Sequence, residues 1–74
     1  MSIADLKVGQ CATILKLNVK NKEIKRHLLD MGLTRGTKIK IKKKPPTGDP
    51  IDIELRDYEL CISKFDLEQI DVTL

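Results

Sequence analysis

The sequence predicts a mainly β domain, a small five-stranded barrel with one short α-helix between the first and second strands. Two observations predict it. Apolar and polar residues alternate in several short runs, which is the pattern of half-buried strands. Glycine, proline, asparagine and aspartate separate the runs, and these are the residues that turns prefer. Five short strands in 74 residues favour a closed or half-closed barrel, because closure removes exposed strand edges.

Length and composition indicate a single domain over residues 1–74. Hydrophobic residues make up 41% and charged residues 34% of the chain, a balance typical of globular rather than disordered proteins. We expect an aliphatic core, because the chain holds one Phe and one Tyr. No apolar run approaches the roughly 18 residues of a membrane span, and the first residues lack a signal-peptide pattern. We therefore expect a cytoplasmic protein that is not embedded in a membrane.

The first two elements are a strand over residues 10–17 and a helix over residues 22–31. Asn21 is a good N-cap, because its side-chain oxygen can accept from a free amide of the first turn. Gly32 follows the helix and easily adopts the left-handed conformation that ends one. Three apolar residues share one helix face, Ile24, Leu28 and Met31. We expect this face to cover one open end of the barrel.

Residues 38–44 and 51–56 are expected to pair as a long hairpin around the turn-forming segment KPPTGDP. The favoured register places four pairs opposite each other: Ile39 with Leu55, Lys40 with Glu54, Ile41 with Ile53, and Lys42 with Asp52. One face is then apolar, and the other carries opposite charges, each pair worth about 0.2–1 kcal/mol. We expect these pairs to neutralise most of the lysines.

The remaining residues predict a fourth strand, a helical turn and a final strand. Leu60 and Ile62 point inward on the fourth strand, with Cys61 on its other side. Ser63 caps a helical turn at residues 64–68. Ile70 and Val72 alternate in the last strand.

Charge is distributed unevenly along the chain. Residues 1–44 carry a net charge of +9 and residues 45–74 a net charge of −6. The basic strand Lys38–Lys44 supports an alternative function, a small barrel that binds nucleic acid. Against it, the chain offers only Tyr58 and Phe65 as stacking aromatics, and lysines outnumber arginines eleven to three.

No residue pattern indicates catalysis or a cofactor. The single histidine, His27, lies at the border of the apolar helix face, and no nucleophile, phosphate loop or paired acids accompany it. Cys11 and Cys61 lack zinc spacing, so no metal site is predicted, and both are expected to be reduced, partly buried thiols.

Two surfaces are candidates for contact with another protein. The first is the helix, where the cations Lys22, Lys25 and Arg26 surround Leu29, away from the apolar face. Leu29 either contacts a partner or packs under the loop at residues 18–21. The second is the hairpin tip, with Pro46 and Asp49. An unpaired edge strand of so small a barrel also leaves room for pairing between two copies of the chain.

The string LLDMGLTRGTKIKI, followed by PPTGDPIDIEL, resembles the FeoA family, small cytoplasmic proteins of bacterial ferrous iron uptake. The resemblance covers nearly the whole chain, while Arg35, Asp57 and Ser63 differ from the usual pattern. It implies an SH3-like barrel without enzymatic activity, a fold shared with the C-terminal domain of iron-dependent repressors. It also implies a partner, the membrane iron transporter FeoB, which has a cytosolic GTP-binding domain and is contacted from its cytosolic side. Direct binding of ferrous iron near His27 or the cysteines stays open as a third alternative.

Overall fold

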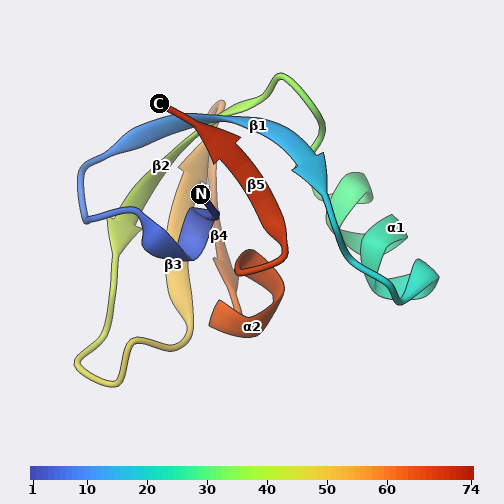
Figure 1. Cartoon of the computed structure of the whole chain (residues 1–74). Helices are drawn as coiled ribbons and strands as arrows, with labels where there is room; N and C mark the ends of the chain where they lie inside the picture. Colours follow the sequence, from blue (N-terminus) through green and yellow to red (C-terminus); the bar gives the residue numbers. More distant parts are fainter.

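The predicted strands pair into one antiparallel sheet in the computed structural model, which describes all residues 1–74 (Figure 1). The strands are β1 (Cys11–Leu17), β2 (Lys38–Lys43), β3 (Ile51–Leu55), β4 (Tyr58–Ile62) and β5 (Ile70–Thr73). Three helical segments accompany them: the 3-10 helix η1 (Ile3–Asp5), α1 (Lys22–Asp30) and the single turn α2 (Lys64–Leu67). The mainly β class, with α1 between β1 and β2, is confirmed.

The sheet is strongly curved but not closed. Its strands lie in the order β4-β3-β2-β1-β5, so β4 and β5 are its two edge strands. The N-terminal residues pair briefly with β5, through a bridge between Ser2 and Asp71. Figure 1 shows β1 and β5 crossing over β2, β3 and β4, which gives the half-closed form of the expected barrel. No helix is long and apolar enough to cross a membrane.

The core is aliphatic, as predicted, since none of its seventeen buried residues is aromatic. The N-terminal segment also contributes to the core, and the sequence did not predict this. The helix η1 and the residue after it bury Ile3 and Leu6 completely. Ser2 and Asp5 form a capping box here, in which the Ser2 backbone amide donates to Asp5 Oδ2 at 2.9 Å. This hydrogen bond is the main reason that the pKa of Asp5 lies below its ordinary value.

Helix α1 has the predicted ends but a smaller buried face. Asn21 Oδ1 accepts from the amides of Glu23 and Ile24, at 2.9 and 3.2 Å, which confirms the N-cap. Leu28 is the one buried residue of the helix, whereas Ile24 is 37% exposed. Of the three residues on the face expected to cover the barrel end, Ile24 thus stays open, while Met31 is half-buried against the core. The helix lies beside the curved sheet (Figure 1) and reaches the core through Leu28, with Met31 at its C-cap packed against the core.

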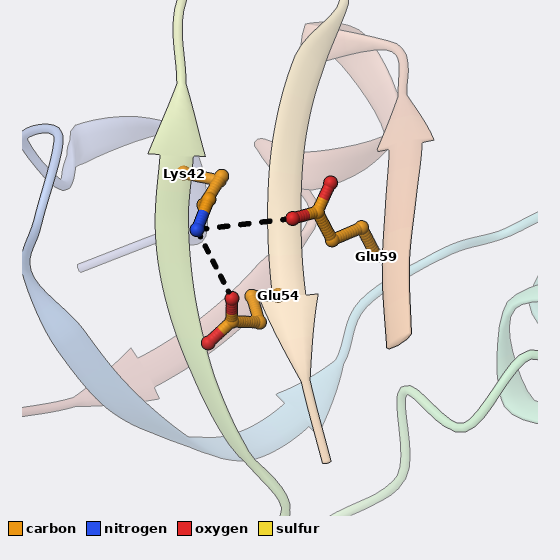
Figure 2. Close-up of polar contacts among 3 residues, drawn as sticks. All are labelled: Lys42, Glu54 and Glu59. Atoms are coloured by element: carbon orange, nitrogen blue, oxygen red, sulfur yellow. Dashed lines mark hydrogen bonds and ion pairs between the residues drawn. The ribbon is translucent and has the colours of Figure 1, made fainter. Parts of the chain in front are cut away.

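The β2–β3 register is confirmed at two of the predicted pairs, Ile41 with Ile53 and Lys40 with Glu54. The pairing of Lys42 with Asp52 is wrong, because an irregularity between Ile41 and Lys43 places Lys43 opposite Asp52. Lys42 turns instead toward Glu54 on β3 and Glu59 on β4. Figure 2 shows its Nζ between their carboxylates, at 3.4 Å from Glu54 and 3.8 Å from Glu59.

The expectation that most lysines of this strand are neutralised is also wrong. Lys42 alone makes ion pairs, and Lys44 Nζ donates to the carbonyl of Ala4 at 3.2 Å. On its other side, β2 pairs with β1, where the partners of Lys38 and Lys40 are Thr13 and Cys11. Because these neighbours are uncharged, β1 offers the lysines no counter-charge.

The last elements agree with the sequence. Ile62 is buried and Leu60 half-buried on β4. The hydroxyl of Ser63 accepts from the Asp66 amide at 3.2 Å and caps α2. Ile70 and Val72 are buried on β5.

Candidate functional site

The candidate site is a groove between β1 and α1. Its lining consists of Leu15, Lys16, Leu17, Lys25, Leu29 and Arg35. Leu15 is 47% and Leu29 36% exposed, whereas Leu17 is buried at the floor. The groove thus combines an apolar surface with three cations, and no acidic side chain lines it. Such a surface suits a partner that is apolar and negatively charged.

The two walls of the groove are held in place by backbone hydrogen bonds. The turn at residues 34–37 is fixed to β1, because the Gly36 amide donates to the Ile14 carbonyl at 2.8 Å. The Ile14 amide in turn donates to Thr37 at 2.9 Å. These bonds set the turn, and with it Arg35, beside Leu15.

The C-terminus of α1 forms a Schellman motif, in which the amides of Gly32 and Leu33 donate to the carbonyls of Leu29 and Leu28. Gly32 has a φ of +102°, in the left-handed region that the motif requires. The Tyr58 hydroxyl donates to the carbonyl of Met31 and ties this helix end to β4. The helical wall that carries Leu29 is therefore anchored at its C-terminus.

The structure separates the six residues predicted for partner contact. Lys25 and Leu29 line the groove, whereas Lys22 and Arg26 lie on α1 outside it, exposed and without an ion pair. The β2–β3 hairpin tip lies on the opposite side of the molecule from α1 (Figure 1), so Pro46 and Asp49 belong to a different surface.

Asp49 also makes a structural contact within the domain. Its Oδ1 accepts from the Lys64 amide at 2.7 Å, which joins the hairpin tip to the start of α2. This contact places a carboxylate where α2 has a free amide.

Of the two alternatives for Leu29, the structure favours the exposed one, since the side chain is open to the groove rather than covered by the loop at residues 18–21. The strand side of the groove was not predicted, although the sequence contains a signal for it. Ala12 and Ile14 follow the inward alternation of β1, so Leu15 is an apolar residue on the outward face.

A second cleft lies on the other side of α1, between this helix and the β4–α2 segment. It is lined by Glu23, Ile24, His27, Leu28, Met31, Cys61, Ile62, Ser63 and Asp66. Four of these residue types can bind metals, yet no three His, Cys, Asp or Glu side chains come together as a metal site anywhere in the chain. His27 is exposed.

Both cysteines are free thiols, but the expectation that they are partly buried is wrong. Cys11 and Cys61 are exposed, because each points to the outer face of its strand. Cys61 faces Asp52 across the β3–β4 ladder. A hydrogen bond to the Asp52 carboxylate, followed by desolvation, raises the pKa of the Cys61 thiol. A raised pKa opposes the thiolate form, so Cys61 is a poor nucleophile.

Three solved structures illustrate the similarity of this chain to known proteins. The FeoA protein from Chlorobium tepidum superposes with a TM-score of 0.92 at 31% identity, covering 100% of this chain and 70% of that one. The Stenotrophomonas maltophilia FeoA complexed with zinc, described as an SH3 domain protein, gives 0.81 at 19% identity over 97% and 88%. T. acidophilum IdeR gives 0.86 at 23% identity over 100% and 33%.

The last two similarities show the fold alone, and the description of the Stenotrophomonas maltophilia protein confirms its SH3-like class. No curated protein sequence matches the chain. A family model described as the FeoA domain matches residues 1–74. The match extends over the strands, the helix α1 and the groove between them, and the chain belongs to the FeoA family.

Proposed function

We propose that this chain is a non-catalytic, cytoplasmic accessory protein of ferrous iron uptake that acts by contact with the transporter FeoB. Its membership of the FeoA family carries the proposal. The Stenotrophomonas maltophilia relative is described as a candidate activating factor of bacterial ferrous iron transport. A role in binding also agrees with the small size of the domain, whose histidine and cysteines are exposed on open surfaces.

The contact surface is the groove between β1 and α1, together with the adjacent cations Lys22 and Arg26 of the helix. Leu15 and Leu29 supply apolar area that is exposed in the free protein, and its burial in a complex contributes about 25 cal/mol per Å². The surrounding cations would fix the orientation of the partner and accelerate its association. The hairpin tip, with Pro46 and Asp49, is a second contact on the opposite side.

An accessory protein changes the activity of its partner only if it binds one state of the partner more tightly than another. This chain would therefore shift FeoB between its states by differential affinity. The direction of the shift follows from which nucleotide state of FeoB binds more tightly.

The test is a titration of FeoB, in detergent or as its cytosolic domain, with the full chain. We expect saturable binding that weakens at least about tenfold in Lys25→Glu and Arg26→Glu, since each places a negative charge on a cationic surface. Lys7→Glu is the matched control, because Lys7 is exposed and lies outside the groove. If FeoB in every nucleotide state fails to bind the wild-type chain, the proposed function is wrong.

A second candidate function, nucleic-acid binding, is favoured by one observation: Lys38, Lys40 and Lys43 make no ion pair. Against it, no aromatic side chain accompanies them on β2 or on its neighbours β1 and β3. Single-stranded and duplex oligonucleotides titrated at low and physiological salt separate the two functions. Tight binding with a steep salt dependence, lost in a Lys38→Gln, Lys40→Gln double variant, would support the nucleic-acid function.

A further inference from the structure

Arg35 joins the groove to a second, fully polar depression. The depression is lined by Thr34, Arg35, Gly36, Thr37, Lys38 and Arg56, none of them hydrophobic. Arg35 also lines the groove that contains Leu15 and Leu29. The apolar groove and the polar depression therefore form one continuous surface, which we call the groove–turn surface.

The groove–turn surface carries positive charge only. Its five cations are Lys16, Lys25, Arg35, Lys38 and Arg56. All five are exposed, none makes an ion pair, and no acidic residue lines either part. Arg56 adopts a left-handed backbone with φ at 52° in the tight turn between β3 and β4. This conformation costs a non-glycine residue about 1 kcal/mol, so the turn presents its cation at some cost to stability.

The depression is better suited to several carboxylates than to one phosphate ion. Phosphate sites of loops commonly use free backbone amides that converge on the anion. Here the Gly36 amide already donates to Ile14 at 2.8 Å, and the Thr37 amide donates to Thr34 at 3.1 Å. The Thr34 and Thr37 hydroxyls are hydrogen-bonded to each other at 2.9 Å. The cationic side chains of Arg35, Lys38 and Arg56 are still free to bind a ligand. Because these side chains are long, each can reach a separate anionic group.

We propose that the groove–turn surface binds an acidic, partly apolar segment of a partner protein. Apolar side chains of the segment pack against Leu15, Leu17 and Leu29, while its carboxylates face Arg35, Lys38 and Arg56. The proposal rests on the proposed function and adds to it the chemistry of the segment that the partner presents. Charge complementarity selects this occupant, because the surface has apolar area and cations but no acidic side chain to pair with a basic ligand.

The direct test uses the full chain and a short synthetic peptide of alternating leucine and glutamate. Two matched peptides carry serine in place of leucine, or glutamine in place of glutamate. We expect the leucine–glutamate peptide to bind and both matched peptides to bind at least about tenfold more weakly. Salt should weaken the binding, because part of it is charge attraction across an exposed surface.

Variants of the chain locate the site. We expect Arg35→Glu and Leu29→Ser each to lower the peptide affinity at least about tenfold, while Lys7→Glu leaves it unchanged. Arg35→Gln removes the charge with less risk to the fold, and circular dichroism checks the fold of every variant. Equal affinity in Arg35→Gln and wild type would overturn the proposal. Equal affinity for the three peptides would also overturn it. So would a surface that binds phosphatidylglycerol vesicles or inorganic phosphate but does not bind the leucine–glutamate peptide.

Failure of the acidic-segment proposal can be distinguished from failure of the proposed function. If FeoB binds the wild-type chain and Arg35→Glu with equal affinity, this inference is wrong and the function stands. If the peptide binds as expected while FeoB does not, the surface is correct and the proposed partner is wrong.

Discussion

Glu54 on β3 and Glu59 on β4 are direct cross-strand partners, so two carboxylates of like charge lie side by side on the outer face of the sheet. Like charges in this arrangement destabilise a sheet. Lys42 from the next strand reduces the repulsion, because its Nζ lies 3.4 Å from Glu54 and 3.8 Å from Glu59 (Figure 2). One lysine thereby links the outer faces of three strands.

We expect Lys42→Met to lower the free energy of unfolding by up to about 1 kcal/mol, since the ion pairs are exposed and the two glutamates are left facing each other. The loss should shrink in high salt, which screens the repulsion. Urea unfolding at low and high salt measures it. Lys40→Met is the control, because Lys40 occupies the same strand face without an ion pair. Equal losses in the two variants would contradict a specific role for Lys42.

Gly32 is expected to be the glycine least tolerant of substitution. Its φ of +102° disfavours any other residue, and an added Cβ would collide with the Tyr58 hydroxyl and lie 3.3 Å from Leu55 Cδ1. We expect Gly32→Ala to cost at least about 2 kcal/mol of unfolding free energy. Gly36→Ala is the matched control, because Gly36 has a φ of +87° but open space around it. Its cost should be about 1 kcal/mol, from backbone conformation alone.

The contribution of the collision can be isolated with a double-mutant cycle. Tyr58→Phe removes the hydroxyl that an alanine at position 32 would meet. Gly32→Ala should therefore be less destabilising in a Tyr58→Phe background than in wild type. Strict additivity of the two substitutions would show that the hydroxyl does not limit this position.

The contact between Asp49 and α2 predicts a stability effect at a position that was first expected to contact a partner. Asp49→Ala removes the acceptor of the Lys64 amide, 2.7 Å away, and we expect a loss of about 0.5–2 kcal/mol in unfolding free energy. Thermal or urea unfolding measures it. Glu68→Ala, which removes an exposed carboxylate without such a bond, should change stability much less. If the two variants are equally stable, the contact does not hold the hairpin tip.

Cys61 is expected to alkylate slowly at neutral pH. The pKa of its thiol is raised by the hydrogen bond to Asp52, by desolvation and by the nearby carboxylates, so the reactive thiolate is scarcer at a given pH than in an ordinary cysteine. In a Cys11→Ser background, the pH profile of the iodoacetamide rate should shift to lower pH when Asp52 becomes Asn. Glu68→Gln, which removes a charge elsewhere, is the control. An unchanged profile in Asp52→Asn would exclude Asp52 as the cause.

Much of the fold follows from local sequence. Alternating apolar residues and turn-formers predicted the strands, and Asn21 and Gly32 predicted both ends of α1. These signals are local, because a cap or an alternation depends on residues only a few positions apart. The pairing of Ile41 with Ile53 was also predictable, since a slip by one residue would expose the isoleucines.

The groove illustrates what could not be predicted. Alternation with Ala12 and Ile14 makes Leu15 an outward residue, but Lys16 is exposed only because the register shifts between Ile14 and Lys16. Nothing local relates either residue to Arg35 or to Leu29. The curvature of the sheet and the hydrogen bonds between Ile14 and the turn at residues 34–37 bring them together. Similarly, the separation of α1 from the hairpin tip depends on the whole path of the chain, so residues sharing one expected role lie on two surfaces.

The sequence by itself thus determined the class of the fold, its strands and its caps, because neighbouring residues decide whether a segment can be half-buried. Only the tertiary structure decided which charges meet. An irregularity in β2 places Lys43 instead of Lys42 opposite Asp52, and Lys42 forms its ion pairs with Glu54 and Glu59. Such an irregularity is set by packing across several strands, and no pattern within a single strand encodes it.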